Sequence, residues 1–190
     1  MELQVNNIIK MRTLTTDDAE LVFAVVDANR EYLSKWLPWV DKSKTSIDTR
    51  NTIISWEDEF QKGTDVIFGI FYDNRYVGNI GLQRMKNKNN SGMIGYWLAE
   101  KEQGKGIVAN CVKAICSYGF CALNLNRIWL QCANLNYRSQ AIPERLGFTK
   151  EGVLRDNEYI NGKYYDSFVY AVLQRDWSSL VKPTDKSICG

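Results

Sequence analysis

The residues best suited to chemistry are the two glycines in the segment 100–109, Glu-Lys-Glu-Gln-Gly-Lys-Gly-Ile-Val-Ala. Gly104 and Gly106 directly precede residues 107–120, where apolar side chains recur at the helical period, so this loop opens a helix. The start of a helix presents backbone N–H groups without intrahelical acceptors and the positive end of the helix dipole. Glycine lets an anion approach that backbone closely. The segment therefore predicts a site for a phosphate or diphosphate.

Two familiar nucleotide-binding patterns fit this segment poorly. A P-loop needs four residues between its glycines, whereas only Lys105 separates Gly104 from Gly106. The letters Gly104-x-Gly106-x-x-Ala109 match the dinucleotide fingerprint, but that motif needs an acidic residue about 20 positions later. No Asp or Glu occurs between Gln103 and Glu144. A nicotinamide dehydrogenase is therefore disfavoured, and a surface helix without any ligand stays open as the alternative.

Composition narrows the function classes further. The chain has 190 residues, of which 45% are hydrophobic, so we expect one globular domain with a sizeable core. A net charge of +2 disfavours nucleic-acid binding through bulk charge. The absence of histidine excludes Ser-His-Asp and Cys-His catalysis, and no metal site is expected. Because neither a signal peptide nor a membrane span of about 18 apolar residues is visible, we expect a cytoplasmic protein without membrane contact.

The elements that must position this loop follow an order of strands and helices. We expect an opening strand over 8–14, a helix capped by Asp17 and Glu20, and two further helical stretches at 30–40 and 48–61. Strands over 66–72 and 76–85 surround an Asp-Asn turn, and a third strand covers 92–99. After the helix at 107–120 we expect a strand at 127–132, a short helix at 139–146, and a closing hairpin of 148–159 and 163–173.

Several motifs in this order resemble the GNAT N-acetyltransferases. The residues Gln103-Gly104-Lys105-Gly106 are similar to the first four positions of their Gln/Arg-x-x-Gly-x-Gly/Ala signature, and Val108 departs from it. Other matching motifs are Asn29-Arg30-x-x-Leu33-x-x-Trp36-Leu37-Pro38-Trp39, Ile94-Gly95-Tyr96-Trp97-Leu98, Asn134-x-Asn136-x-x-Ser139, Arg145-Leu146-Gly147-Phe148 and Tyr165-Asp166-Ser167-Phe168-Val169-Tyr170. Together they resemble the branch that acetylates alanine or serine at the N-termini of ribosomal proteins.

The resemblance covers about residues 8–178 and implies an α+β acetyltransferase (GNAT) fold. In that fold a mostly antiparallel central sheet is splayed at the cofactor-binding strand and flanked by helices. It implies a single domain over residues 1–180, a polar tail over 181–190, and acetyl-CoA as co-substrate. A backbone N–H near Leu98 would face the thioester carbonyl. The cofactor-binding residues implied are Trp97, Leu98, Gln103, Gly104, Lys105, Gly106, Ile107, Val108, Asn134 and Asn136.

The group that protonates the departing thiolate is implied by the same resemblance. Many family members use a tyrosine seven residues after the position of Asn136, where this chain has Pro143. The ribosomal branch uses a serine instead, which Ser139 matches. Two alternatives stay open: Tyr137 could substitute, and Ser139 could merely cap the following helix. Since Pro143 is tolerated most easily in a first turn, that helix could begin after position 139.

The acceptor side is less defined. Trp36 and Trp39 could wall an amine pocket, and Glu31, Asp41 and Glu158 are candidates for the general base that deprotonates the amine. Asp166, an acid in the middle of a strand, would bind either the amine or a buried partner. The expected acceptor is a ribosomal protein N-terminus. The alternatives are a small amine (a polyamine or an aminoglycoside) and a catalytically idle CoA-binding module. The resemblance also carries the expectation of a homodimer.

Overall fold

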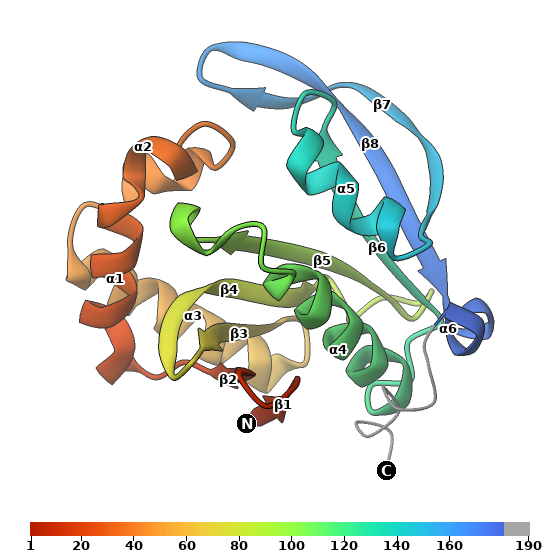
Figure 1. Ribbon diagram of the computed structural model, residues 1–190, viewed down its shortest axis with the longest axis horizontal. Coiled ribbons are helices and arrows are strands. Elements are labelled where there is room, and N and C mark those ends of the chain that lie inside the picture. The colour runs from red at the N-terminus through yellow and green to blue at the C-terminus, as the bar shows by residue number, and fades with distance from the viewer. Residues whose placement is uncertain (181–190) are drawn as a thin grey trace.

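The computed structural model describes residues 1–180, and the predicted polar tail at 181–190 lies outside the described residues. One eight-stranded sheet has the order β1-β2-β3-β4-β5-β6-β8-β7, with helices on both faces (Figure 1). The strands are β1 (Glu2–Gln4), β2 (Ile9–Thr13), β3 (Val66–Tyr72), β4 (Arg75–Gln83), β5 (Ser91–Leu98), β6 (Arg127–Ala133), β7 (Thr149–Ile160) and β8 (Lys163–Leu173). The helices are η1 (Thr16–Asp18), α1 (Ala19–Ala28), α2 (Arg30–Leu33), η2 (Pro38–Lys42), α3 (Ser46–Lys62), η3 (Glu100–Glu102), α4 (Ile107–Cys121), α5 (Tyr137–Arg145) and α6 (Gln174–Leu180).

Two apolar clusters cover the two faces of the sheet. Helix α4, whose inward side is almost wholly apolar, packs on β4 and β5 and completes the larger cluster, which includes Phe68 and Ile115. Helices α1 and α3 cover the other face, where Val22 and Val26 contact Phe71 and Tyr76. Successive side chains of a strand point to opposite faces of the sheet, so each strand contributes residues to both clusters. This arrangement confirms the expected α+β acetyltransferase fold.

The sheet opens between β5 and β6. All other neighbouring strands are antiparallel, whereas β5 and β6 run parallel and pair only at Ser91 with Arg127, Gly92 with Ile128, and Met93 with Trp129. Beyond these residues the two strands separate, and Figure 1 shows β5 and β6 diverging toward α5. The backbone groups of residues 94–98 that point away from β4 therefore have no strand partner. The predicted splay at the cofactor-binding strand is confirmed.

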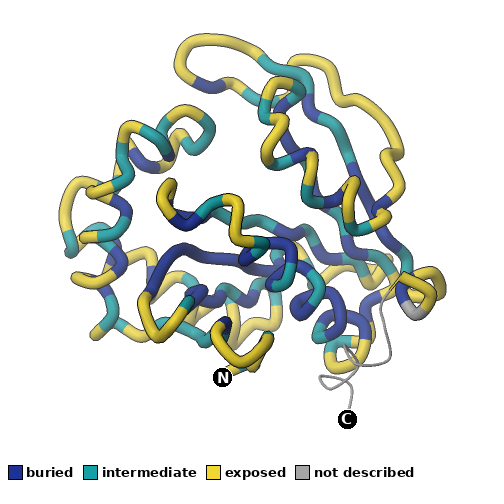
Figure 2. The backbone as a smooth tube through the Cα atoms, viewed as in Figure 1, coloured by how far each residue is buried: buried dark blue, intermediate teal, exposed yellow. Residues whose placement is uncertain are grey.

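Both hairpins form where the turn residues predicted them. Asp73 and Asn74 have φ values of 51° and 59°, and Asn161 and Gly162 have 51° and 81°. Positive φ at both central positions is the type I′ turn that matches the twist of two-residue hairpins. The strand β7 is exposed along most of its length, as the yellow tube in Figure 2 shows.

The structure corrects two predictions in the first third of the chain. The cap of the first helical segment is formed by Thr15 and Asp18, not by Asp17 and Glu20: the Asp18 carboxylate accepts from the Thr15 N–H at 2.8 Å. The stretch 30–40 is not one helix, because α2 ends at Leu33 and η2 starts at Pro38. Proline disfavours helical backbone at the preceding residue, and Leu37 accordingly has φ −125° and ψ 87°.

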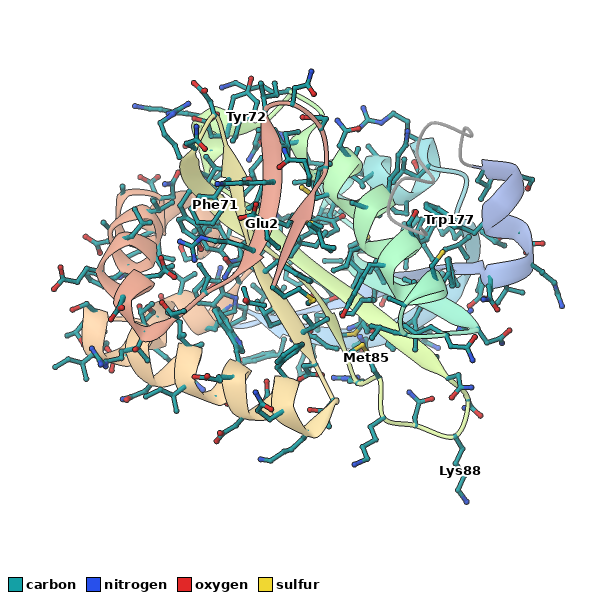
Figure 3. All side chains as sticks on the ribbon, turned by 90° about the horizontal axis from the view of Figure 1, so that it is seen from below. Glu2, Phe71, Tyr72, Met85, Lys88 and Trp177 are labelled. Atoms are coloured by element: carbon teal, nitrogen blue, oxygen red, sulfur yellow. The ribbon has the colours of Figure 1, made fainter. Side chains whose placement is uncertain are left out.

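Three elements, namely β1, the single turn η3 and α6, were not predicted. Strand β1 pairs with β2 at the N-terminal edge of the sheet. Helix α6 is held by Trp177, which donates from Nε1 to Ser117 Oγ at 3.2 Å and packs on Phe120 of α4 (Figure 3). Among the helices of residues 1–180, none is long and apolar enough to cross a membrane.

Candidate functional site

The separation of β5 from β6 opens a cavity of about 620 Å³, which we call the cofactor cavity. Its floor is the end of β5, its rim is the loop 103–106 with the start of α4, and its far wall is α5. Of the predicted cofactor residues it is lined by Trp97, Leu98, Gln103, Gly104, Gly106, Ile107, Val108 and Asn136. Residues far apart in the sequence thus share one concave site.

The loop before α4 has the geometry of an anion site. Gly104 and Gly106 have φ values of 76° and 73°, in the left-handed region that favours glycine. A Cβ at Gly104 would meet no atom within 4 Å, so the glycine is required by the backbone and not by crowding. The first N–H of the turn with a backbone acceptor is that of Asn110, which donates to Gly106 O at 3.1 Å. The preceding N–H groups are available to a diphosphate at the positive end of α4.

Gln103 joins the two walls of the cofactor cavity. Its side-chain amide donates to the Tyr32 hydroxyl, and its carbonyl oxygen accepts from the Arg138 guanidinium. Both partners also line the cavity, and Arg145, two turns further along α5, lines it too. Two guanidinium groups therefore face the same space as the free N–H groups, a combination that suits a phosphorylated ligand.

Lys105, predicted to help bind the cofactor, does not line the cavity. Its Nζ lies 2.7 Å from Glu102 Oε2 and 5.3 Å from the centre of the Tyr72 ring. Glu102 also contacts Arg75 at 3.5 Å, so two cations offset the buried carboxylate. The Lys105 side chain thereby neutralises the Glu102 carboxylate beside the loop.

A second cavity of about 280 Å³, which we call the acceptor cavity, lies on the other side of the opening. Five residues line both cavities, namely Trp36, Leu37, Tyr96, Asn136 and Ser139. Ser139 therefore stands at the junction of the two spaces. A group bound in one cavity can meet a group bound in the other at this serine.

The local structure around Ser139 excludes one of its predicted roles. The cap of α5 is Asn136, whose Oδ1 accepts from the Ser139 N–H at 3.3 Å, so Ser139 does not cap the helix. The helix begins at Tyr137, earlier than expected, and contains Pro143 in its interior. The Ser139 Oγ lies 3.1 Å from the Tyr96 hydroxyl. Tyr137 is 69% exposed and lines neither cavity, so its hydroxyl is not at the junction.

The predicted acceptor residues divide into two groups. Trp36 lines both cavities and packs edge-on against Tyr165 with ring centres 5.7 Å apart. Glu158 lines the acceptor cavity and accepts from Ser167 Oγ at 2.5 Å. The remaining candidates, Trp39, Asp41 and Glu31, line neither cavity.

Asp166 and Asn134 make structural contacts outside the two cavities, although the side-chain Oδ1 of Asn134 is buried without a hydrogen-bond partner. Asp166 accepts from the Asp156 N–H at 3.0 Å, so its carboxylate satisfies a backbone group in the bulge of β7. Asn134, predicted to bind the cofactor, lines neither cavity; its backbone oxygen accepts from Gln140 Nε2 at 2.9 Å. Both residues hold the start of α5 and the closing hairpin in place.

Reasoning from the sequence missed four side chains of the site. The sequence analysis includes Tyr96 only as part of a motif, yet its part-buried hydroxyl reaches the junction, and desolvation raises its pKa. Tyr32, Arg138 and Arg145 line the cofactor cavity without having been predicted. The spacing of Arg138 and Arg145, seven residues apart on one helix, is a signal that they share a face. Tyr32 could not have been found, since it meets Gln103 across 71 positions.

Comparison with known proteins identifies the family of this chain. A family model described as an acetyltransferase (GNAT) domain matches residues 9–149. The chain is 35% identical over 175 residues to YdaF of Bacillus subtilis, named as a candidate ribosomal N-acetyltransferase, covering 92% of this chain and 96% of that one. It is 27% identical to the ribosomal-protein-serine acetyltransferase of Escherichia coli, covering 89% and 94%. A solved structure of RimL, a ribosomal L7/L12 alpha-N-protein acetyltransferase in complex with coenzyme A, is similar with a TM-score of 0.88 and 26% identity, covering 91% and 98%. The chain therefore belongs to the GNAT family and is an acetyl-CoA-dependent N-acetyltransferase.

Proposed function

We propose that this enzyme acetylates the N-terminal amine of a ribosomal protein that begins with alanine or serine. The observation that carries the proposal is the meeting of the cofactor and acceptor cavities at Ser139 and Tyr96. The names of the relatives support the class of acceptor, because the E. coli enzyme acts on a ribosomal-protein serine. The acceptor cavity is bordered by the β7–β8 hairpin, whose tip exposes Tyr159 and Tyr164, and these rings offer a surface for residues that follow the terminal amine.

In this proposal the cofactor cavity holds acetyl-CoA by its phosphates and its pantetheine arm. The N–H groups of the loop 104–108, with Arg138 and Arg145, bind the phosphates, while the unpaired edge of β5 at Trp97 and Leu98 lies along the arm. Bound in this way, the thioester stands beside the junction and its carbonyl oxygen can accept from a backbone N–H of β5. Holding the two reactants together supplies a large part of the rate.

The proton transfers are assigned to two residues on opposite sides of the junction. Glu158 is the general base, because it alone among the predicted carboxylates lines the acceptor cavity. It accepts a proton from the incoming ammonium, directly or through one water molecule. Ser139 lends its hydroxyl hydrogen to the departing sulfur. A hydroxyl is a weak acid, so Ser139 acts as a relay: it gives its hydrogen to the thiolate as the thiolate leaves and takes up the second proton that the nitrogen loses as the amide forms.

An acceptor panel tests the proposal. Purified enzyme with acetyl-CoA is offered peptides of about ten residues that begin with the N-terminal sequences of ribosomal proteins, each with a matched peptide whose α-amine is blocked. Spermidine and an aminoglycoside are the small-amine arms. We expect acetylation at the α-amine of alanine- or serine-initiated peptides, located by fragmentation mass spectrometry. Turnover restricted to the small amines would contradict the ribosomal acceptor, and binding of acetyl-CoA without any transfer would contradict catalysis on all of these acceptors.

A further inference from the structure

Pro143 leaves one backbone oxygen of α5 without its usual donor. In an α-helix the N–H of residue i donates to the carbonyl of residue i−4, and proline has no N–H. The carbonyl affected by Pro143 is that of Ser139. In this protein the Tyr96 hydroxyl, arriving from β5, donates to Ser139 O at 3.1 Å. A side chain from the cofactor-binding strand thus takes the place of a missing helix amide at the position of the predicted acid.

The same phenol also contacts the Ser139 side chain. Tyr96 Oη lies 3.1 Å from Ser139 Oγ, and either atom can be the donor. A phenol has a single proton. While that proton goes to Ser139 O, the contact with Oγ must be donated by the serine. When the phenol turns its proton to Oγ instead, the serine hydrogen is released and can point into the cofactor cavity.

We infer that Tyr96 is a positioning residue, which holds the Ser139 hydroxyl at the junction and determines when its hydrogen faces the departing sulfur. The inference rests on the proposed role of Ser139. Its geometric basis is the pair of contacts at 3.1 Å together with the loss of the amide at Pro143. Tyr96 is half-buried, and desolvation raises the pKa of its phenol, so it stays a neutral donor over the working range of pH. The neighbouring Cys132 thiol is likewise kept neutral, since burial raises its pKa to about 11.

The first test removes only the phenolic oxygen. Tyr96→Phe should lower kcat about tenfold, the effect of one hydrogen bond, while the KM for acetyl-CoA stays within about twofold. Tyr170→Phe is the matched control, because the Tyr170 hydroxyl also bonds to α5, donating to Glu144 at 2.8 Å, but lines neither cavity. This control should lose stability without losing kcat. An unchanged kcat in Tyr96→Phe would overturn the inference.

A double variant shows whether Tyr96 acts through Ser139. If it does, Tyr96→Phe with Ser139→Ala should be no slower than Ser139→Ala alone. If the decrease in kcat of the double variant equals the product of the decreases in the two single variants, Tyr96 acts independently of Ser139 and the inference is overturned. A slow Ser139→Ala beside a wild-type Tyr96→Phe would overturn the inference alone and leave the proposed function intact. A wild-type rate in Ser139→Ala would contradict the proposed acid instead.

A second variant, Pro143→Ala, distinguishes positioning of the Ser139 hydroxyl from stabilisation of α5. Pro143→Ala restores an N–H that can donate to Ser139 O. Introduced into Tyr96→Phe, it should recover the unfolding midpoint lost with the phenol, while kcat stays about tenfold low because Oγ still lacks its partner. It also keeps the test usable if Tyr96→Phe alone folds poorly. Recovery of kcat together with stability would mean that Tyr96 only completes the helix, and the inference would fall.

Discussion

Asn161, at the tip of the β7–β8 hairpin, donates through Nδ2 to the backbone oxygen of Ser34 at 3.0 Å. These residues are separated by 127 positions, and the contact fastens the hairpin tip to the segment that follows α2 (Figure 1). The edge-on pair of Trp36 and Tyr165 lies beside it, with Trp36 lining both cavities. One side-chain amide therefore helps to close the outer side of the acceptor cavity.

Loss of the hydrogen bond between Asn161 and Ser34 should weaken binding of the acceptor and leave binding of the cofactor unchanged. Asn161→Gly removes the amide but keeps a residue that tolerates the φ of 51° at this turn. We expect the KM for a peptide acceptor to rise about threefold to tenfold, in line with one hydrogen bond, with an unchanged Kd for acetyl-CoA. Asn74→Gly, at the second turn position of the β3–β4 hairpin and likewise at positive φ, is the control. Equal effects of both variants on the KM would show that the contact with Ser34 is irrelevant.

The anion site is tested at Gly106. Gly106→Glu places a bulky anion where the phosphates are proposed to bind, and we expect the Kd for acetyl-CoA to rise at least tenfold. A residue other than glycine also costs about 1 kcal/mol at a φ of 73°. Gly63→Glu is matched for this strain, because Gly63 has φ 68°, lies at the end of α3 and has open space around it. If calorimetric titration gives the wild-type Kd in a folded Gly106→Glu variant, the phosphates bind somewhere other than this loop.

Glu158→Gln tests the general base. The amide keeps the size of the side chain and an oxygen that can accept from Ser167 Oγ, but it cannot take a proton. We expect kcat to fall about a hundredfold with a stable fold, the usual effect of losing a general base. The control is Glu151→Gln on the same strand, where the carboxylate binds Arg127 at 2.6 Å outside both cavities. Comparable rates for the two variants would exclude Glu158 as the base.

The pH dependence of stability has an identifiable source in Asp18. Its hydrogen bonds with Arg12, at 2.6 and 2.8 Å, hold the pKa of this carboxyl below its ordinary value of 3.8. A lowered folded-state pKa contributes stability that is present above the unfolded pKa and is lost as pH falls through the folded one. Asp18→Asn should therefore cost about 1–2 kcal/mol of unfolding free energy at pH 7. The difference from wild type should shrink below pH 3.8.

Urea titrations at several pH values measure this difference. Asp17→Asn, at the exposed neighbouring position, should change the stability little at any pH. A destabilisation by Asp18→Asn that is the same at pH 7 and at pH 3 would mean that packing, and not the charge pair, is lost.

Local signals explain which elements could be predicted. Both hairpins depend on two-residue turns whose residues accept positive φ, so the sequence determines them within four positions. The loop before α4 is similarly local, because Gly104 and Gly106 provide both the backbone conformation and the start of the helix. By contrast, β1 and α6 are stabilised by distant partners, as the bond between Trp177 and Ser117 illustrates. Their short segments carry no comparable signal of their own.

The candidate site follows the same division. Ser139, Gln103 and the glycines could be proposed from spaced motifs, and all of them line the cofactor cavity. Tyr96 meets Ser139 across 43 positions, through an opening in the sheet whose depth no pattern reveals. A basic residue beside the loop suits an anion, so the sequence predicts that Lys105 binds the cofactor, whereas in the structure its side chain pairs with buried Glu102. Which of two possible partners such a side chain binds depends on the tertiary structure, which the sequence pattern does not reveal.

The central claim is that Ser139 assists the departing thiolate at the meeting point of the two cavities. The most direct test measures kcat for Ser139→Ala with a peptide acceptor, beside the Kd for acetyl-CoA from calorimetry, with Tyr137→Phe as the exposed neighbouring control. We predict that kcat falls about a hundredfold, as for one lost acid–base contact, while the Kd stays within about twofold and Tyr137→Phe is unaffected. A wild-type kcat in a folded Ser139→Ala variant would contradict this account.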